Sequence, residues 1–259
     1  MNIFKNIFLS LKTIKNINYF ILDYFNLVKK PEIIYNLRNG LKFISRTRTT
    51  DSAEIIIINS DFEYPKKYYP KNKNPIILDI GANIGSFCIF VNKCLAEQNP
   101  QIYSLEPNKS NFEYLNKNIA LNGFQSNIKT FCLGLYNKNG IGRIDLSQNS
   151  DSFHVTNTEC SEYEEVEIII LEDFCSKNNI DFIDLLKIDI EGNEYEVFGR
   201  SIDFIKNKVI NIFVEVHNLD ENRNFQSFKK YIVGNGFKIV AEIAERTLFL
   251  ENLNNIYLL

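Results

Sequence analysis

The sequence has no excess of positive charge. Its 29 lysines and arginines are set against 32 aspartates and glutamates, which gives a formal net charge of −3 and a pI near 5.6. A protein that binds nucleic acid by neutralising many phosphates usually presents a basic face. The composition therefore argues against nucleic acid as a partner.

Cysteine pairs of the CxxC type are also absent. The five cysteines are Cys88, Cys94, Cys132, Cys160 and Cys175. Their spacing matches neither a set of zinc ligands nor a small disulfide framework. Reduced, mostly buried thiols are therefore expected, as in a cytoplasmic enzyme.

No apolar run is long enough to span a membrane. Charged residues interrupt the apolar N-terminal stretch at Lys5, Lys12, Lys15 and Asp23, well before the length of about 18 residues that suggests a spanning helix. Apolar residues in this stretch follow helical spacing, so one or two amphipathic helices are predicted over residues 3–29. We expect their apolar face to pack on the rest of the chain or to form a homo-oligomer, rather than to lie on a membrane surface.

The chain divides into an N-terminal lead-in, residues 1–74, and a larger domain, residues 75–259. Within the lead-in, Asn39-Gly40 stands between two apolar stretches and predicts a β-hairpin with a type I′ turn. The proline- and lysine-rich stretch 64–75 is expected to be a connection rather than a packed element.

After the lead-in, short apolar strands alternate with helical patterns, which is typical of βαβ units and a mainly parallel sheet. Strands are expected near residues 76–80, 101–105, 128–133, 182–188, 209–216, 236–243 and 246–250. The helix after the second strand has a capping-box pattern in Ser110 and Glu113, and Asn122-Gly123 provides its stop signal. No internal repeat is present.

The segment ILDIGANIGSF predicts a glycine turn between a buried strand and a helix. This turn contains Asp79, Gly81, Asn83 and Gly85. Glycine lets the backbone turn tightly and approach a ligand at the carboxyl edge of a parallel sheet. The spacing fits neither the GxxxxGK[ST] of a P-loop nor the GxGxxG of a dinucleotide site. An acid ahead of the glycines suits a cofactor with a cationic sulfonium and an amino group better than a pyrophosphate.

The second strand of the larger domain ends in Glu106, 21 residues beyond Gly85. An acid about 20 residues beyond the glycines binds the ribose in dinucleotide enzymes. We therefore expect Glu106 to accept hydrogen bonds from a cofactor ribose, with Pro107 and Asn108 beside it.

Charged residues alternate at the ends of the next two strands. One strand ends with Lys187, Asp189 and Glu191, and the other with Glu215 and His217. A period of two places each set on one face, and burying such charges together is costly unless they pair or bind something. Lys187 can equally form a structural ion pair with one of the acids. The ordinary pKa of histidine suits a general base at neutral pH.

Together, the segments ILDIGANIGSF, SLEPN, LKIDIEGNE and VEVHN resemble the FkbM family of S-adenosylmethionine-dependent methyltransferases, over roughly residues 50–250. TTDSAE at 49–54 and Glu63-Tyr64 also resemble the family's lead-in. The resemblance implies a Rossmann-like class I methyltransferase fold, an α/β fold with a seven-stranded, mostly parallel sheet and one antiparallel strand. The N-terminal helices and hairpin would be an extension of it, and residues 75–259 the catalytic domain.

The same resemblance implies roles for individual residues. The glycine turn would hold the methionine part of S-adenosyl-L-methionine, and Glu106 its ribose. The reaction centre would be lined by Asp189, Glu191, Glu215 and His217. The acceptor would be a hydroxyl of a sugar, a polysaccharide precursor or a related natural product. The sequence departs from the family in its long amphipathic start and in the polar loop 147–162, which stands between the strand patterns GRIDLS and YEEVEIIIL.

Several alternatives stay open at this level. His217 is the preferred base and Asp189 the second choice, because an ordinary carboxylate is a weak base unless desolvation raises its pKa. Asp189, Glu191, Glu215 and His217 could instead hold a divalent metal that binds the acceptor oxygen, although a metal is not the favoured interpretation. A non-catalytic cofactor-binding or assembly protein on the same fold is the alternative function.

Overall fold

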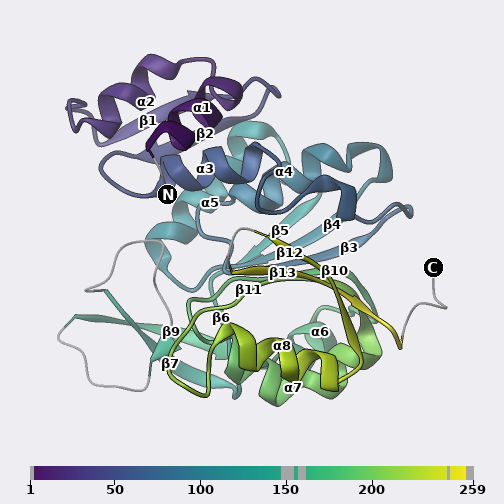
Figure 1. The fold of residues 1–259 in the computed structure, drawn as a ribbon. Coiled ribbons are helices and arrows are strands. Elements are labelled where there is room, and N and C mark those ends of the chain that lie inside the picture. The colour runs from purple at the N-terminus through teal and green to yellow at the C-terminus, as the bar shows by residue number, and fades with distance from the viewer. Residues whose placement is uncertain (1–2, 147–154, 157–161, 244–245, 255–259) are drawn as a thin grey trace.

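The computed structural model describes residues 3–146, 155–156, 162–243 and 246–254 (Figure 1). Its centre is a seven-stranded sheet with the order β12-β13-β11-β10-β3-β4-β5. The strands are β3 (Ile76–Ile80), β4 (Gln101–Leu105), β5 (Ile128–Phe131), β10 (Ile183–Ile188), β11 (Val209–Glu215), β12 (Phe237–Ile243) and β13 (Thr247–Asn252). The strands from β11 to β5 are parallel, and β13 is antiparallel to both of its neighbours. The predicted Rossmann-like α/β fold with one antiparallel strand is confirmed.

Helices cover both faces of this sheet (Figure 1). One face packs against α3 (Asp51–Asn59), α4 (Ser86–Cys94) and α5 (Lys109–Asn122), and the other against α6 (Leu171–Lys177), α7 (Glu194–Lys208) and α8 (Phe225–Gly234). A short 3-10 turn, η2 (Ala96–Gln98), follows α4. Because both faces are covered, neighbouring residues of β3 are both buried: Ile77 packs in the core under α4, and Leu78 in the core on the opposite side.

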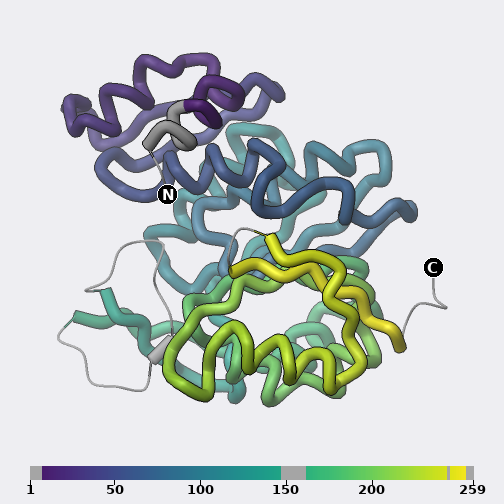
Figure 2. Tube along the Cα trace, in the orientation of Figure 1, coloured from purple at the N-terminus to yellow at the C-terminus, as the bar shows by residue number. Residues whose placement is uncertain are grey.

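The part of the lead-in before α3 forms a separate layer beyond α3 and α5, drawn in purple in Figure 2. It consists of α1 (Ile3–Thr13), α2 (Ile17–Tyr24) and a hairpin of β1 (Glu32–Asn36) and β2 (Lys42–Arg46). The two predicted helices are confirmed, but their apolar face packs on the rest of the chain only in part: Ile14 and Phe20 are buried, whereas Phe8 and Leu11 are exposed.

Side-chain amides on α5 dock the lead-in onto the larger domain. The backbone N–H groups of Ile44 and Lys42 donate to the side chains of Asn118 and Asn122, at 2.7 Å and 3.0 Å. Both amides donate back to the carbonyls of the same two residues, at 3.2 Å and 2.7 Å. The outer edge of β2 is thereby satisfied, which an unpaired edge strand requires when it is covered.

The hairpin is confirmed, but the predicted type I′ turn is wrong. That turn needs a positive φ at both central residues, whereas only Gly40, at φ 92°, has one. The Leu37 N–H donates to the Leu41 carbonyl at 2.8 Å, so three residues form the loop. The Gly40 N–H also bonds the Leu37 carbonyl, which fits a type I turn followed by one left-handed glycine.

The predicted capping box of α5 is wrong as well. The helix starts one residue before Ser110, and its N-cap is Asn108, whose side chain accepts from the Asn111 N–H at 2.9 Å. Asparagine is as good an N-cap as serine, so Asn108, two residues after Glu106, can begin the helix in place of Ser110. The predicted stop is confirmed, because Gly123 closes the helix at φ 73°.

The stretch 64–75 was expected to be an unpacked connection, and the structure corrects this. Tyr64 and Tyr69 are buried in the core, and Tyr68, in the short turn η1 (Lys66–Tyr68), stacks on Phe249 with ring centroids 4.2 Å apart. Burial of three aromatic rings outweighs the turn-forming composition of the stretch.

A second, four-stranded sheet is inserted between β5 and α6. It contains β6 (Gly134–Leu135), β7 (Gly140–Asp145), β8 (Val155–Thr156) and β9 (Tyr163–Ile169) in the order β6-β9-β7-β8. The predicted antiparallel pair is confirmed as β7 and β9. Apart from β8, the polar loop 147–162 lies almost entirely outside the described residues. None of the helices within the described ranges has the length and apolarity to cross a membrane.

Candidate active site

The carboxyl ends of β3, β4, β10 and β11 and the side of α3 enclose a cavity of about 260 Å³. One half, the cofactor half, is lined by Gly81, Asn83, Leu105, Glu106, Pro107, Asn111, Leu133, Gly134 and Leu135. The other, the acidic half, is lined by Glu54, Glu63, Tyr64, Lys187, Asp189, Glu191, Glu215 and Arg246. The topology thus brings the glycine turn, the strand-end Glu106 and the alternating charges of β10 and β11 to one place.

The glycine turn is shaped first by contact between neighbouring strand ends. Gly81 has φ 76°, and a Cβ on it would lie 1.8 Å from the Asp189 carbonyl oxygen. Gly85 has φ 91°, and a Cβ there would lie 2.8 Å from a methyl group of Leu115. Both positions therefore require glycine for backbone conformation and close packing, in addition to any approach of a ligand.

Glu106 lies at the end of β4 and is held by two backbone donors. The Asn83 N–H donates to its Oε2 at 2.9 Å and the Asn108 N–H to its Oε1 at 3.0 Å. Glu106 is only 4% exposed, whereas an ordinary acid at the end of a strand would be solvated. Burial raises the pKa of Glu106 to about 7, against the lowering effect of the two N–H donors.

The neighbours of Glu106 divide between the cavity and the fold. Pro107 lines the cavity. Asn108 is buried away from it, where it caps α5 and donates to Glu164 at 3.0 Å. Asn83 has φ 47° and donates through its side chain to Glu54 on α3, while its buried Oδ1 has no hydrogen-bond partner among the described residues.

Asp79 and Lys187 form a buried pair beneath the glycine turn. The Lys187 Nζ lies 3.4 Å from Asp79 Oδ1 and 3.6 Å from Asp189 Oδ2, and it donates to the Gly81 carbonyl at 2.8 Å. Burial opposes the ammonium charge, but Asp79 and Asp189 outweigh it and raise the pKa of Lys187. Asp79 is fully buried and does not line the cavity, so its side chain supports the turn from behind.

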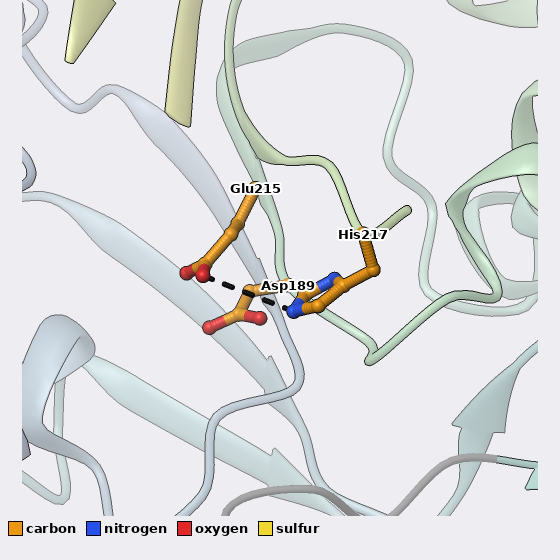
Figure 3. A group of neighbouring side chains, drawn as sticks. All are labelled: Asp189, Glu215 and His217. Atoms are coloured by element: carbon orange, nitrogen blue, oxygen red, sulfur yellow. Dashed lines mark ion pairs between the residues drawn. The ribbon is translucent and has the colours of Figure 1, made fainter. Parts of the chain in front are cut away.

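Asp189, Glu215 and His217 converge from the ends of β10 and β11 (Figure 3). The His217 Nε2 lies 3.1 Å from Glu191 Oε2 and 3.8 Å from Glu215 Oε1. On the other side of the ring, Nδ1 is hydrogen-bonded to Glu194 Oε1 at 3.0 Å. The four residues predicted to meet at the reaction centre therefore lie together.

The surroundings of His217 change its expected chemistry. Burial disfavours the imidazolium, but the hydrogen bond to Glu194 and the charges of Glu194 and Glu191 outweigh it and raise the pKa of His217 to about 9. The ring is 7% exposed and stands behind the side chains that line the cavity. Histidine was expected to titrate near its ordinary pKa, and the surrounding carboxylates prevent this.

Several residues of the acidic half were not predicted as site residues. Glu63 lies partly buried beside Glu215, and desolvation together with the charge of Asp189 raises its pKa to about 7. Arg246 pairs with Glu215, with 2.6 Å between Nη2 and Oε1. Glu54 is partly buried, and its pKa is raised well above the ordinary value, mainly by desolvation.

A signal for some of these residues was present in the sequence. Glu54 and Glu63 belong to the lead-in segments TTDSAE and Glu63-Tyr64, and Glu194 ends LKIDIEGNE. These segments were recognised as patterns without a role for each acid. Arg246 stands in no motif, and only the antiparallel pairing of β13 with β11 brings it to Glu215.

The sequence and the fold are similar to those of known proteins. A family model described as the methyltransferase FkbM domain matches residues 79–256. Methyltransferase sdnD of Sordaria araneosa is 28% identical over 155 residues, which cover 48% of this chain and 59% of that protein. The chain thus matches less than two thirds of this curated relative.

Solved structures of similar fold include a methyltransferase FkbM from Methylobacillus flagellatus KT, with 12% identity and a TM-score of 0.49 over 77% of this chain and 53% of that one. Another is TrmK of M. capricolum in complex with S-adenosyl-homocysteine, with 15% identity and a TM-score of 0.40 over 71% of this chain and 64% of that one.

Proposed function

The chain belongs to the FkbM methyltransferase family, and from this we propose that it is an S-adenosylmethionine-dependent O-methyltransferase. Its acceptor would be a hydroxyl of a sugar, a polysaccharide precursor or a related natural product. The observation that carries the cofactor assignment is the position of Glu106, a buried carboxylate at the edge of the cavity, held by the N–H groups of Asn83 and Asn108.

The residues of the cofactor half fit S-adenosylmethionine. Glu106 would accept the ribose hydroxyls, as acids at this place do in related folds. Gly81 and Asn83 would hold the methionine part, and the buried Asn83 Oδ1, which has no partner among the described residues, can accept from its amino group. Apolar side chains at Leu133 and Leu135 would cover the adenine. The bound cofactor supplies a methyl group on a positively charged sulfur.

The acidic half fits a cationic group and an acceptor hydroxyl. Carboxylates concentrated at one wall attract positive charge, more strongly in a partly buried site than in water. Lys187 would keep Asp79 and Asp189 in place through the contacts described above. The cavity could therefore hold the cofactor's sulfonium against the wall from which the acceptor is activated.

Asp189 is the residue that we propose takes the proton from the acceptor hydroxyl. Its side chain lines the cavity and is 26% exposed. His217 was the first choice. With a pKa of about 9, however, its imidazole is mostly protonated at neutral pH, and a protonated imidazole cannot accept a proton. His217 would instead orient Glu191 and Glu215 from behind.

The acceptor itself would enter along the lead-in. A second cavity, of about 280 Å³, shares Thr50 and Ala53 with the first. It is lined by aromatic side chains of α2 and by charged groups: Phe20, Tyr24, Asp23 and Arg48. Rings beside a few polar groups are the usual composition of a small-molecule site, and a sugar presents both C–H faces and hydroxyls to such a surface.

Binding and turnover can be measured separately. We expect calorimetry to detect binding of S-adenosylmethionine, and a screen of sugars and nucleotide sugars to yield S-adenosylhomocysteine with at least one acceptor. Glu106→Gln should weaken S-adenosylmethionine binding, and Asp189→Asn should lower turnover. Binding without turnover on any acceptor would support the alternative of a non-catalytic cofactor-binding protein. Absence of binding would contradict the proposed function.

We also propose that the protein works in the cytoplasm. Cys88, Cys94, Cys132 and Cys175 are free thiols, which suits a reducing compartment. Cys160 lies outside the described residues.

A further inference from the structure

We propose that the acidic half of the cavity binds one divalent metal ion, through Asp189, Glu215 and His217. One potential ligand atom from each residue lies within 4.8 Å of the other two. Opposite ligands around an ion with bonds of about 2.1 Å stand about 4.2 Å apart. Small side-chain rotations would therefore bring the three groups of Figure 3 to coordinating positions.

His217 supplies an observation independent of the carboxylates. Its side chain is 9% exposed, and its Nε2 has no hydrogen-bond partner among the described residues. Glu191 Oε2 lies 3.1 Å from Nε2 but outside hydrogen-bonding geometry. Nε2 faces the carboxylate of Glu215, so a buried nitrogen is directed into the cluster without a defined donor or acceptor.

The other ring nitrogen is fixed as metal sites usually fix it. Nδ1 is hydrogen-bonded to Glu194 Oε1 at 3.0 Å. Glu194 is fully buried and accepts the N–H groups of Ile190 and Gly192, both at 3.2 Å. Histidines that bind metals commonly donate their second N–H to a carboxylate, which sets the ring orientation. Glu194 would be that partner, and the metal would replace the proton on Nε2.

The local charge balance also favours a cation. Among the described residues, the carboxylates that line or back this half are Glu54, Glu63, Asp189, Glu191, Glu194 and Glu215. The cationic side chains there are Lys187, Arg246 and His217. Packing so many acids at a half-buried wall is costly unless charge is neutralised, and a divalent ion offsets two of them.

The nearby cations leave room for the ion. Arg246 contacts Glu215 through Oε1, and Lys187 contacts Asp189 through Oδ2. Each contact uses one carboxylate oxygen, and a carboxylate has a second oxygen to offer a metal. Two carboxylates and one imidazole suit Mn²⁺ or Mg²⁺, with water or an acceptor oxygen in the other positions.

The catalytic role of this metal ion rests on the proposed function, but the experiments that test whether the ion binds do not. An acceptor hydroxyl that binds the ion would have a lower pKa. Its proton would then pass more easily to Asp189 through Oδ2, the oxygen that contacts Lys187 and does not bind the ion. A diol acceptor could offer two oxygens to the same ion, which connects the metal to the sugar class proposed above.

Mn²⁺ is the probe for the test, with tag-free protein so that added histidines do not bind it. We expect calorimetry to show one Mn²⁺ per chain. Asp189→Asn and His217→Gln should each weaken binding by more than about tenfold, since even groups that only orient ligands contribute that much. Glu113→Gln, a change of an exposed carboxylate on α5, is the matched control and should bind as the wild type does.

Pulsed electron paramagnetic resonance of bound Mn²⁺ tests the ligand set in the unaltered protein. We expect a coupling to one histidine nitrogen. The chain has two histidines, His154 and His217, so His154→Gln should keep the coupling and His217→Gln should lose it. Wild-type protein that binds no Mn²⁺ at millimolar concentration, or bound Mn²⁺ without nitrogen coupling, would overturn the proposal.

S-adenosylmethionine binding, measured in the presence of EDTA, separates the two proposals. Cofactor binding without any Mn²⁺ site would overturn the metal proposal and leave the methyltransferase proposal standing. An Mn²⁺ site with the expected nitrogen coupling would support the metal proposal even if S-adenosylmethionine failed to bind.

Discussion

The two halves of the cavity are built in different ways. The cofactor half is made mostly of backbone: a turn with positive φ at Gly81, Asn83 and Gly85, and N–H groups that hold one acid, Glu106. The acidic half is made of side chains from α3, β10, β11 and the turn before β13. The cofactor half depends on the glycine turn and the neighbouring strand end at Glu106. The acidic half forms only when distant parts of the chain have come together.

The largest expected effect is on the chemistry of the acidic half. Asp189→Asn should lower turnover by about 10²- to 10⁴-fold, the usual range for loss of general-base catalysis, with little change in S-adenosylmethionine affinity. Steady-state kinetics with the acceptor found in the screen, and calorimetry for the cofactor, provide the two measurements.

His217→Ala is the informative companion to that variant. If His217 orients Glu191 and Glu215 or binds the proposed metal ion, and is not the base, its loss should reduce turnover less than Asp189→Asn does. A loss of turnover larger than that of Asp189→Asn, together with loss of a pH limb near 9, would return the base role to His217.

Gly81→Ala should damage both halves at once. The added Cβ would meet the Asp189 carbonyl at 1.8 Å in a backbone with φ 76°, so β3 and β10 would have to separate. We expect a loss of about 3 kcal/mol or more in the free energy of unfolding, measured by urea denaturation.

Gly40→Ala is the matched control for that substitution. Gly40 also has a positive φ, 92°, but no atom lies within 4 Å of its added Cβ. It should cost only the backbone strain of about 1–2 kcal/mol. Equal losses for the two variants would contradict the claim that close contact between the strand ends requires Gly81.

Because of Glu106, we expect the stability of the protein and its cofactor affinity to change in opposite directions with pH. Its pKa in the folded protein is raised to about 7, so folding favours the protonated form, and the stability from this group is lost as pH rises towards 7. Cofactor affinity should change the other way, because the carboxylate is the form that accepts two ribose hydroxyls. Below about pH 7 we expect affinity to fall by up to about tenfold per pH unit.

Glu106→Gln should remove the slope in cofactor affinity and weaken S-adenosylmethionine binding, as seen by calorimetry across pH. It should reduce but not abolish the slope in stability measured by thermal denaturation, because the pKa of Glu63 is also raised to about 7. Glu113→Gln, on the exposed surface of α5, should leave both slopes unchanged. A wild-type affinity that does not vary between acidic and neutral pH would contradict the ribose role of Glu106.

The smallest expected effect concerns the lead-in, which borders the acidic half. Phe25 and Leu27 are 62% and 64% exposed after α2, and we propose that they contribute to self-association. Leu27→Asp should lower dimer formation in sedimentation velocity and change stability by less than about 0.5 kcal/mol. Ile141→Asp, at an equally exposed position on β7, is the control. Tight binding of wild type to anionic vesicles, lost on truncation of α1 and α2, would favour a membrane role.

The contrast between the halves also explains what could be predicted from sequence. The strands of the main sheet were found because both of their faces are buried and their residues are therefore continuously apolar, as Ile77 and Leu78 illustrate. Glu106 and the turn at Gly81 were found because their spacing along the chain is fixed by one βαβ unit. These features are determined by neighbours in the sequence.

The remaining features depend on contacts that the sequence does not display. Glu63 and Arg246 reach Glu215 from segments far apart in the chain. The raised pKa of His217, which follows β11, results from Asp189, Glu191 and Glu194, which follow β10. The capping box at Ser110 failed for a local reason, since Asn108, two residues earlier, already caps the helix through the Asn111 N–H. Helix α3, which carries Glu54, was missed because it has buried isoleucines on several sides and little amphipathic pattern.

The docking of β2 onto α5 has an evolutionary consequence. In the lead-in, Asn118 and Asn122 bind the backbone N–H and C=O groups of Ile44 and Lys42, and every amino acid except proline presents those groups. This contact therefore does not depend on which side chains stand at positions 42 and 44, whereas Phe43 between them is buried in the core and Glu32 contacts Tyr114 and Lys117 through its side chain. A lineage can change the side chains at these two positions while the lead-in keeps its place beside the cavity.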